Sequence, residues 1–293
     1  MNLSSLLLIG TSTLALVACS SQAPYQLDQQ QTGVVEFAPS VISTSEHFEI
    51  NTVFNKTGDN VIFARCNDAF SHCTLMESQH EGGQWQAPKA LPFSGDFLDA
   101  DPYYSPDFQT LYFVSKRPID GGIEASKSIN LWRVSRQGES WGSPEYLKNL
   151  SSEEHDLYPS ITSNGDLYFP SFRNNQRKMY VAKKTATGFD KPIALPTYMF
   201  GEGAAIGDSV VLPDGNSIIF SMRRGDSVGN GDLYISHKHN GKWSVAKTLG
   251  EKVNTVDHEF TPIVSPDGNY LFFTRIESGK GNLYQVSLPE LLE

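Results

Sequence analysis

The stretch that decides the fold is Ser265-Pro266-Asp267-Gly268, which is followed at once by the run Asn269-Tyr270-Leu271-Phe272-Phe273. Pro fixes φ, Asp accepts hydrogen bonds from its own backbone and Gly takes positive φ, so this stretch predicts a tight turn leading into a strand. Variants of the turn occur earlier in the chain, as Ser105-Pro106-Asp107, Leu212-Pro213-Asp214-Gly215, Ser163-Asn164-Gly165 and Lys56-Thr57-Gly58. The combination of turn and strand therefore occurs five times.

The five copies share further features in a constant order. Each copy closes its apolar strand on a phenylalanine, at intervals of 50, 56, 51 and 53 residues: Phe63, Phe113, Phe169, Phe220 and Phe273. Another short strand follows, and then a hairpin in which an aromatic residue precedes a proline, as in Trp141-Gly142-Ser143-Pro144. Units of about fifty residues with four short strands are typical of propeller blades. We therefore predict an all-β fold, a β-propeller.

These copies resemble the TolB-like, WD40-like propeller repeat, whose mark is Ser-Pro-Asp-Gly before an apolar strand. The resemblance covers residues 46–288. The fifth copy has no outer strand of its own, whereas residues 33–39 have strand character and no place in the first copy. We therefore expect five four-stranded blades, with this N-terminal strand completing the last blade and closing the ring. The alternative, six blades as in the TolB domain, would need about fifty further residues.

The N-terminal residues resemble the signal of bacterial lipoproteins. Residues 3–17 are apolar and uncharged, and the run ends in Leu16-Val17-Ala18-Cys19. It is about as long as the apolar h-region of a secretory signal and too short for a comfortable bilayer span. The resemblance implies a signal peptide over residues 1–18, a lipid on Cys19 and, because Ser20 is not Asp, a place on the periplasmic face of the outer membrane. The alternative is a non-lipidated signal peptide or an uncleaved anchor. Polar residues 19–33 would form a tether, and residues 34–293 a single propeller domain.

The chain has three cysteines. If Cys19 carries a lipid, Cys66 and Cys73 remain as a pair that can be oxidised in the periplasm. Cys66 ends one expected strand and Cys73 begins the next, so a hairpin would place them opposite each other at bridging distance. We predict a disulfide between them. Two free thiols that act as small hydrophobic side chains are the alternative, and a zinc site would lack further cysteines.

Charge and motifs narrow the possible functions. The chain has 33 acidic and 23 basic residues, a net charge of −10, which disfavours nucleic acid as a partner. The sequence contains none of the usual nucleophile, zinc-protease, phosphate-loop or calcium-loop motifs. We expect a monomeric binding or scaffold module for a protein or glycan partner, attached to the membrane by its lipid. The alternative is a glycoside hydrolase, lyase or other hydrolase with its site at the mouth of the central channel.

The candidate site residues are acids and histidines that recur just before the innermost strand of a blade. Three copies carry such pairs, and two others carry acids alone: Glu46-His47, His155-Asp156, Asp257-His258-Glu259, Asp99 with Asp101, and Glu202. Equivalent positions of a propeller converge on its central channel, so these side chains predict a ligand site there, or a site for a divalent metal ion such as Ca²⁺ or Zn²⁺. Ordinary loop polarity is the alternative interpretation.

An arginine follows each recurring phenylalanine by two to four residues. The set comprises Arg65, Arg117, Arg173, Arg223 or Arg224, and Arg275. We expect these arginines to form ion pairs between blades with the acids that precede the innermost strands.

Overall fold

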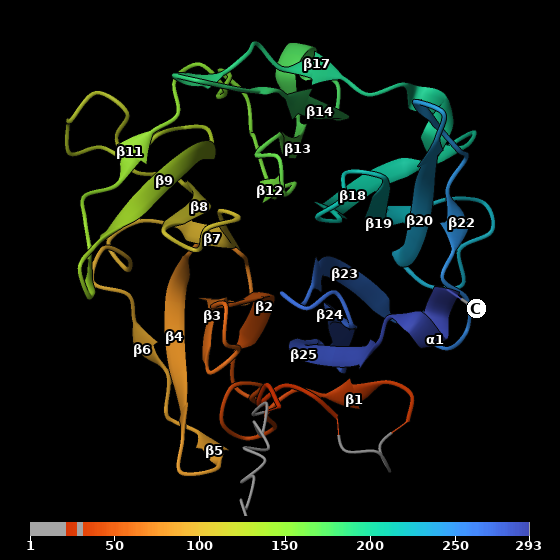
Figure 1. The fold of residues 1–293 in the computed structure, drawn as a ribbon, viewed down its shortest axis with the longest axis horizontal. Coiled ribbons are helices and arrows are strands. Elements are labelled where there is room, and N and C mark those ends of the chain that lie inside the picture. Colours follow the sequence, from red (N-terminus) through yellow and green to blue (C-terminus); the bar gives the residue numbers. More distant parts are fainter. Residues whose placement is uncertain (1–21, 28–31, 293) are drawn as a thin grey trace, which may run out of the picture.

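The computed structural model describes residues 22–27 and 32–292 of the chain. Five β-sheets stand around a central axis as the blades of a propeller (Figure 1). The fold is therefore all-β with five blades, as predicted, and the six-bladed alternative is excluded. No helix in the part of the chain that the structure describes has the length and apolar character needed to cross a membrane.

Each blade runs from an innermost strand at the axis to a short strand at the periphery. Blade one consists of β2 (Phe48–Phe54), β3 (Asn60–Cys66), β4 (Cys73–Glu81) and β6 (Lys89–Ala90). Blade two consists of β7 (Asp99–Tyr104), β8 (Thr110–Ser115), β9 (Asn130–Gln137) and β11 (Glu145–Tyr146). Blade three consists of β12 (Ser160–Ile161), β13 (Leu167–Ser171), β14 (Lys178–Ala182) and β17 (Ile193–Ala194). Blade four consists of β18 (Ala205–Val211), β19 (Ser217–Arg223), β20 (Asp232–His239) and β22 (Lys247–Thr248).

Short elements complete the blades at their edges. Two-residue strands form the outer hairpins: β5 (Gln84–Trp85), β10 (Ser140–Trp141), β15 (Lys184–Thr185), β16 (Gly188–Phe189) and β21 (Lys242–Trp243). Among the described residues, three short helices lie in connections or near the C-terminus: η1 (Arg173–Asn175), η2 (Thr197–Phe200) and α1 (Pro289–Leu292).

The fifth blade is completed by the N-terminal strand. It consists of β23 (His258–Val264), β24 (Tyr270–Glu277), β25 (Lys280–Ser287) and β1 (Val35–Glu36). Strand β1 lies antiparallel to β25, and the backbone N–H of Phe37 extends the ladder by donating to the carbonyl of Leu283 at 2.8 Å (Figure 1). The predicted ring closure is therefore confirmed.

The core follows the repeat that the sequence shows. All five recurring phenylalanines are completely buried: Phe63, Phe113, Phe169, Phe220 and Phe273. Each lies on the second strand of its blade, where alternate side chains pack between neighbouring sheets. The recurring phenylalanine of each copy therefore packs between neighbouring blades.

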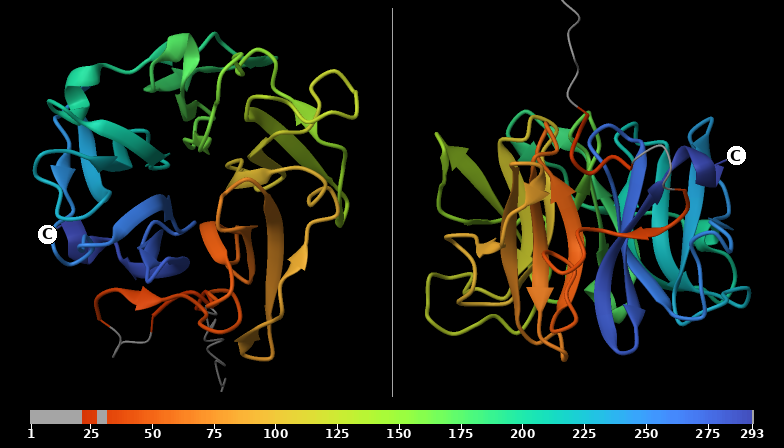
Figure 2. Two further views of the ribbon diagram at one scale, coloured as in Figure 1. Left: turned by 180° about the vertical axis from the view of Figure 1, so that it is seen from behind. Right: turned by 90° about the horizontal axis from the view of Figure 1, so that it is seen from below.

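The strands run between two faces of the ring, as the side view in Figure 2 shows. The turn face carries the tight turns between first and second strands, at residues 55–59, 105–109, 162–166, 212–216 and 265–269. We call the opposite face the funnel face, because a funnel-shaped cavity opens on it. On this face the innermost strands begin, and loops join the second strands to the third strands, as at residues 67–72 and 224–231.

The predicted disulfide is present. Cys66 and Cys73 are paired opposite each other on β3 and β4 and are bonded through their sulfurs. The bond closes the hairpin over residues 67–72, whose tip carries Phe70 on the funnel face. Within this hairpin the Phe70 backbone N–H donates to the Asn67 carbonyl at 3.0 Å. The crosslink therefore holds an exposed aromatic residue in place.

Part of the expected tether packs on the propeller. Tyr25 is only 3% exposed, and its ring lies 4.6 Å from that of Phe54 and 6.0 Å from that of Phe272. Gln26 donates to the Asp267 carboxylate at 3.2 Å, on the turn face. The expected tether over residues 19–33 is therefore interrupted by a segment that belongs to the folded domain. Cys19 and the signal peptide lie outside the described residues.

Candidate functional site

Four acids at the start of innermost strands are completely buried, and each faces one arginine of the repeat. The pairs are Glu49 with Arg65 at 2.9 Å, Asp99 with Arg117 at 2.8 Å, Asp156 with Arg173 at 2.9 Å and Glu259 with Arg275 at 2.7 Å. Each pair joins the first strand to the second strand, or to the residues just after it, within one blade. The expectation of ion pairs between blades is therefore wrong: the acid and the arginine are neighbours across one sheet.

The same guanidinium groups hold the chain that arrives from the preceding element. Five arginines each donate to a carbonyl of that segment: Arg65 to Ile42, Arg117 to Phe93, Arg173 to Leu150, Arg224 to Phe200 and Arg275 to Val253. In four blades the guanidinium also lies 5.0–5.6 Å from the recurring phenylalanine ring of the same blade. The four buried acids therefore bind these arginines as part of the fold, and they are not free to bind a ligand.

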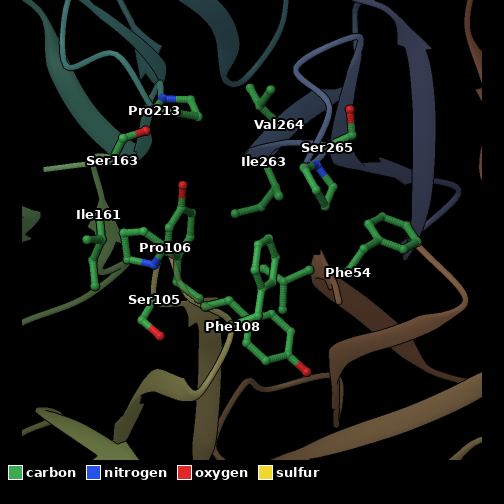
Figure 3. Close-up of a pocket in the computed structure, with 14 residues that line it drawn as sticks. Phe54, Ser105, Pro106, Phe108, Ile161, Ser163, Pro213, Ile263, Val264 and Ser265 are labelled. Atoms are coloured by element: carbon green, nitrogen blue, oxygen red, sulfur yellow. The ribbon is translucent and has the colours of Figure 1, made fainter. Parts of the chain in front are cut away.

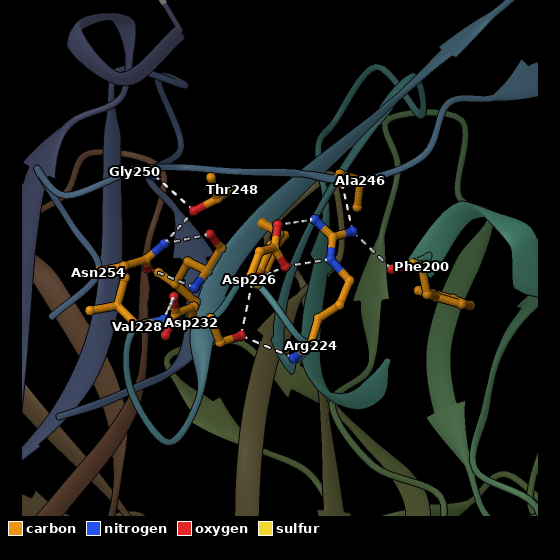
Figure 4. Close-up of polar contacts among 12 residues, drawn as sticks. Phe200, Arg224, Asp226, Val228, Asp232, Ala246, Thr248, Gly250 and Asn254 are labelled. Carbon is orange, nitrogen blue, oxygen red and sulfur yellow. Dashed lines mark hydrogen bonds and ion pairs between the residues drawn. The ribbon is translucent and has the colours of Figure 1, made fainter. Parts of the chain in front are cut away.

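Blade four departs from this pattern. Ala205 stands opposite Arg223, where two other blades pair an acid with an arginine across the same strands. Arg224 instead pairs with Asp226 at 2.7 Å, and it donates to the carbonyls of Phe200 and Ala246 (Figure 4). The hydrogen bond from Arg224 lowers the pKa of Asp226 to about 2. Ala205 therefore stands where the other two blades have the buried acid of the ion pair.

A funnel of about 510 Å³ opens beside Ala205 on the funnel face. Its lining comes from blades one, three, four and five, and from their hairpins: Ile50, Phe70, Tyr158, Arg177, Ala205, Ile206, Gly207, Asp208, Ser221, Met222, Arg223, Asn230, Gly231, His258 and Phe260. The upper wall is largely apolar, with Phe70 and Phe260 in edge contact at 6.4 Å. The funnel thus combines apolar side chains with charged ones, which is typical of ligand sites.

The innermost strands bring polar groups to the base of this funnel through an irregular backbone. Asn51, Asp101, Tyr158 and Thr261 all have positive φ, between 46° and 52°, at equivalent places in four blades. In three of these blades the pairing with the second strand shifts register at that residue. Blade four has Gly207 there, and a Cβ at this position would lie 2.6 Å from the Ser221 carbonyl oxygen. Four blades therefore carry a residue with positive φ at this place, and blade four carries a glycine.

Two carboxylates are buried at this level. Asp101 is 3% exposed and accepts a hydrogen bond from the Tyr158 backbone N–H at 3.1 Å. Asp208 is 6% exposed and accepts one from the Thr261 backbone N–H at 2.9 Å. Arg177 Nη2 lies 3.6 Å from Asp208 Oδ1. The two acids, unlike those of the four ion pairs, share a single arginine at longer range.

Burial dominates the electrostatics of these groups. Loss of hydration raises the pKa of Asp101 well above its ordinary value, and the nearby Asp208 charge raises it further. Burial also raises the pKa of Asp208, although Arg177 and the Thr261 N–H oppose the shift. The pKa of Tyr158 is raised well above 10, again mainly by burial. Perturbed groups gathered in a cleft mark this funnel as the candidate functional site.

The structure separates the three histidines that the sequence suggested as ligands. His47 Nδ1 lies 3.3 Å from the Thr44 hydroxyl, in a pocket that it shares with Glu46. His155 Nδ1 accepts a hydrogen bond from the Ile129 N–H at 2.9 Å. His258 alone lines the funnel, stacked 4.9 Å from Phe260.

The predicted metal site is not assembled. Across residues 22–27 and 32–292, no three His, Cys, Asp or Glu side chains lie close enough to hold a metal ion. Glu46 and Glu202 are exposed, and Asp257 is only partly buried. Asp99, Asp156 and Glu259 are held by arginines. The structure therefore brings Asp101 and His258 of the predicted set to the funnel region and leaves the others elsewhere.

Sequence reasoning missed Tyr158, Arg177 and Asp208. Tyr158 lies two residues after the buried acid of its blade, as Asp101 and Thr261 do in theirs, so aligning the copies at these acids would have found it. Asp208 gives no such signal, because blade four has Ala205 in place of the acid. Arg177 comes from a hairpin of blade three, and only the fold brings it to Asp208 of blade four.

A second pocket, of about 160 Å³, lies at the turn face (Figure 3). The tight turns and the ends of innermost strands surround it, with Phe54, Pro106, Ile161, Pro213 and Ile263 in its lining. None of the described residues that line it is an acid, a lysine, an arginine or a histidine. This pocket lacks the charged groups that the funnel offers, so the funnel is the better candidate.

Comparison with known proteins supports the fold. No protein-family model matches the sequence, and no curated protein matches it. Among solved structures, a TolB candidate from Agrobacterium tumefaciens is similar over 83% of this chain and 78% of its own, with 12% identity and a TM-score of 0.54. A structure described as a glycoside hydrolase is similar over 88% of this chain and 91% of its own, with 9% identity and a TM-score of 0.57.

A third similar structure is much longer than this chain. Hydrazine synthase of Kuenenia stuttgartiensis is similar over 85% of this chain but only 38% of its own, with 12% identity and a TM-score of 0.51. Identities this low show a shared fold, and one propeller fold supports many functions. The chain is a five-bladed β-propeller that is structurally similar to TolB-like propellers.

Proposed function

We propose that this chain is a non-catalytic binding module that takes a protein partner on its funnel face. The observation that carries this proposal is a set of exposed apolar side chains around the funnel face. They are Phe70, 36% exposed, Ile119, 48%, Ile123, 93%, Val228, 57%, and Val256, 75%. Their hairpins and connections belong to blades one, two, four and five. Exposed apolar residues on one face, around a polar cleft, are typical of protein interfaces.

A protein fits this surface better than a glycan does. Four of these five exposed side chains are aliphatic, and burial of aliphatic side chains against other apolar side chains is favourable in free energy. A sugar ring would call for exposed aromatic faces, and Phe70 is the one aromatic side chain of this set. The four buried acids held by arginines also fit a rigid scaffold.

A hydrolase is the second candidate function. The buried pair Asp101 and Asp208 favours it, because carboxyls with raised pKa values serve as general acids. Binding comes first, because a hydrolase gives no role to the exposed apolar side chains around the funnel face. An activity on glycosides or esters that Asp208→Asn abolished would reverse this order.

Photocrosslinking tests the proposed surface. With p-benzoylphenylalanine at position 123 or 256, we expect one specific protein adduct in the native cell envelope, because these positions lie at the proposed contact. The matched control is position 193 on β17 of blade three, where Ile193 is 66% exposed at the periphery. Mass spectrometry identifies the adducts, and Val228→Asp with Val256→Asp is expected to lower the yield at position 123 about ten-fold. Equal adducts at position 193, or a glycan adduct alone, would contradict the proposal.

We further propose that Cys19 carries a lipid that holds the module at the periplasmic face of the outer membrane. The lipobox-like Leu16-Val17-Ala18-Cys19 supports this proposal. Cys19→Ser is expected to abolish labelling with a palmitate analogue and to release the protein from sedimented membranes, because the lipid would be attached at Cys19. Cys66→Ser with Cys73→Ser serves as the control for loss of a cysteine. Labelling that survives Cys19→Ser would refute the proposal.

A further inference from the structure

We infer that the base of the funnel binds a primary ammonium group, the end of a lysine side chain of the partner. This inference rests on the proposed protein-binding function and names the chemical group that enters the funnel. It starts from buried hydrogen-bond acceptors on the innermost strands, one of which, Asp208, lines the funnel.

The acceptors come from three blades. Asp101 and Asp208 each accept one backbone N–H, from Tyr158 and Thr261, and a carboxylate has room for several donors. Asn51 occupies in blade one the positive-φ place that Asp101 occupies in blade two, so it also lies at the axis. Asn51 is 3% exposed, and its Oδ1 has no hydrogen-bond partner. A buried acceptor without a donor is costly unless a ligand supplies one.

The charged groups at this place also favour an ammonium ligand. The titratable and charged groups that face this space are Asp101, Asp208, Tyr158, Arg177, His258 and Arg223. Arg177 is 3.6 Å from Asp208, and its guanidinium also lies 5.1 Å from the Phe172 ring. One arginine at this range balances one of two carboxylates. Arg223 is exposed at the wall and acts through water. An ammonium group supplies one positive charge and three donors without adding an acceptor.

The shape of the funnel suits a lysine. Ile50, Phe70 and Phe260 line the funnel together with Asp208, so methylene groups can pack against them while the charged end reaches Asp208. A shorter cation such as a metal ion would leave the apolar wall without contacts.

Ionisation sets the expected pH dependence. Because burial raises the pKa of both carboxyls, they ionise at a higher pH than exposed carboxyls do. Ammonium binding favours the ionised acids, so binding releases protons. Affinity is therefore expected to increase as pH rises through the raised pKa values, while a lysine side chain stays charged up to about pH 10.

The test compares two probes on the protein without its signal peptide. Nα-acetyl-lysine methylamide carries the ammonium, and Nα-acetyl-norleucine methylamide is its uncharged counterpart. We expect the lysine probe to bind about ten-fold more tightly in NMR titrations, and its affinity to rise as the pH is raised. Asp208→Asn is expected to reduce lysine binding about ten-fold. Asp257→Asn, at a partly buried acid outside the funnel lining, is the matched control and leaves binding unchanged.

Several results would overturn the inference. Equal affinities for the two probes, tighter binding of Nα-acetyl-glutamate methylamide, or unchanged binding by folded Asp208→Asn would each do so. Should Asp208→Asn fail to fold, the two probes on the native protein decide: tighter binding of the lysine probe supports the inference, and equal binding of the uncharged probe refutes it. Crosslinks on the funnel face without lysine binding would refute this inference alone. Lysine binding without such crosslinks would refute the docking surface alone.

Discussion

Glu259→Gln is expected to lower the free energy of unfolding by about 3–5 kcal/mol, because it leaves a buried guanidinium without its counter-charge. The Glu259 side chain is completely buried, and that of Arg275 is 10% exposed, with Nε and Oε1 2.7 Å apart. Arg275 also donates to the Val253 carbonyl at 2.8 Å, which ties the connection from blade four to blade five. Loss of the carboxylate therefore weakens both the sheet and the joint between blades. Denaturant unfolding followed by tryptophan fluorescence measures the change.

The matched control is the exposed pair in blade four. Arg224 and Asp226 are also 2.7 Å apart, but the Asp226 side chain is 52% exposed. Asp226→Asn is therefore expected to cost less than about 1 kcal/mol. Replacing both buried partners, with Glu259→Leu and Arg275→Met, is expected to cost less than Glu259→Gln alone, because no buried charge is left unpaired. Similar losses for the buried and the exposed pair would contradict this account of the arginine network.

Deletion of residues 34–39 is expected to lower the free energy of unfolding by more than about 4 kcal/mol. The deletion removes Phe37, which is 3% exposed and packs 5.6 Å from Phe54 of blade one and 5.4 Å from Phe272 of blade five. Loss of one buried phenylalanine side chain alone costs about 3–5 kcal/mol. The deletion also strips β25 of its partner β1, leaving an open sheet edge where the ring closes. Thermal and denaturant unfolding measure the loss.

Two control variants distinguish the loss of ring closure from a nonspecific effect of mutation. Phe37→Ala keeps the backbone of β1 and should retain the pairing with β25, so its loss should be smaller than that of the deletion. Ile123→Ala, at a residue that is 93% exposed, should change stability by less than about 0.5 kcal/mol. An unchanged melting temperature for the deletion would show that the ring holds without its N-terminal strand.

Part of the candidate site could be read from the sequence, because repeats place equivalent residues at equivalent heights. The repeat points to Asp101 and His258; His258 lines the funnel, and Asp101 lies near its lining residues Asp208 and Arg177. The same reasoning failed for His47 and His155, because a shared position before a strand does not determine which way a side chain turns. His155 turns to the Ile129 backbone, and His47 turns toward Thr44.

The sequence by itself determined the features that depend on local turns and on alternation along a strand. The Ser265-Pro266-Asp267-Gly268 turn and its variants define five blades, and the strand character of residues 33–39 indicates the closing strand. The positions of Cys66 and Cys73 at facing ends of a hairpin determine the disulfide. Each of these features needs contacts only within one repeat or at one strand edge, where backbone geometry leaves few choices.

Only the tertiary structure decided which residues meet in the funnel. Asp101, Tyr158 and Asp208 come from three different blades, and Arg177 reaches Asp208 from the hairpin of the preceding blade. No spacing along the chain encodes these contacts, because they depend on how far each sheet is rotated against the next. The funnel opens at blade four because Ala205 and Gly207 are small and the usual buried ion pair is absent there, and packing of the complete ring turns that local difference into a site.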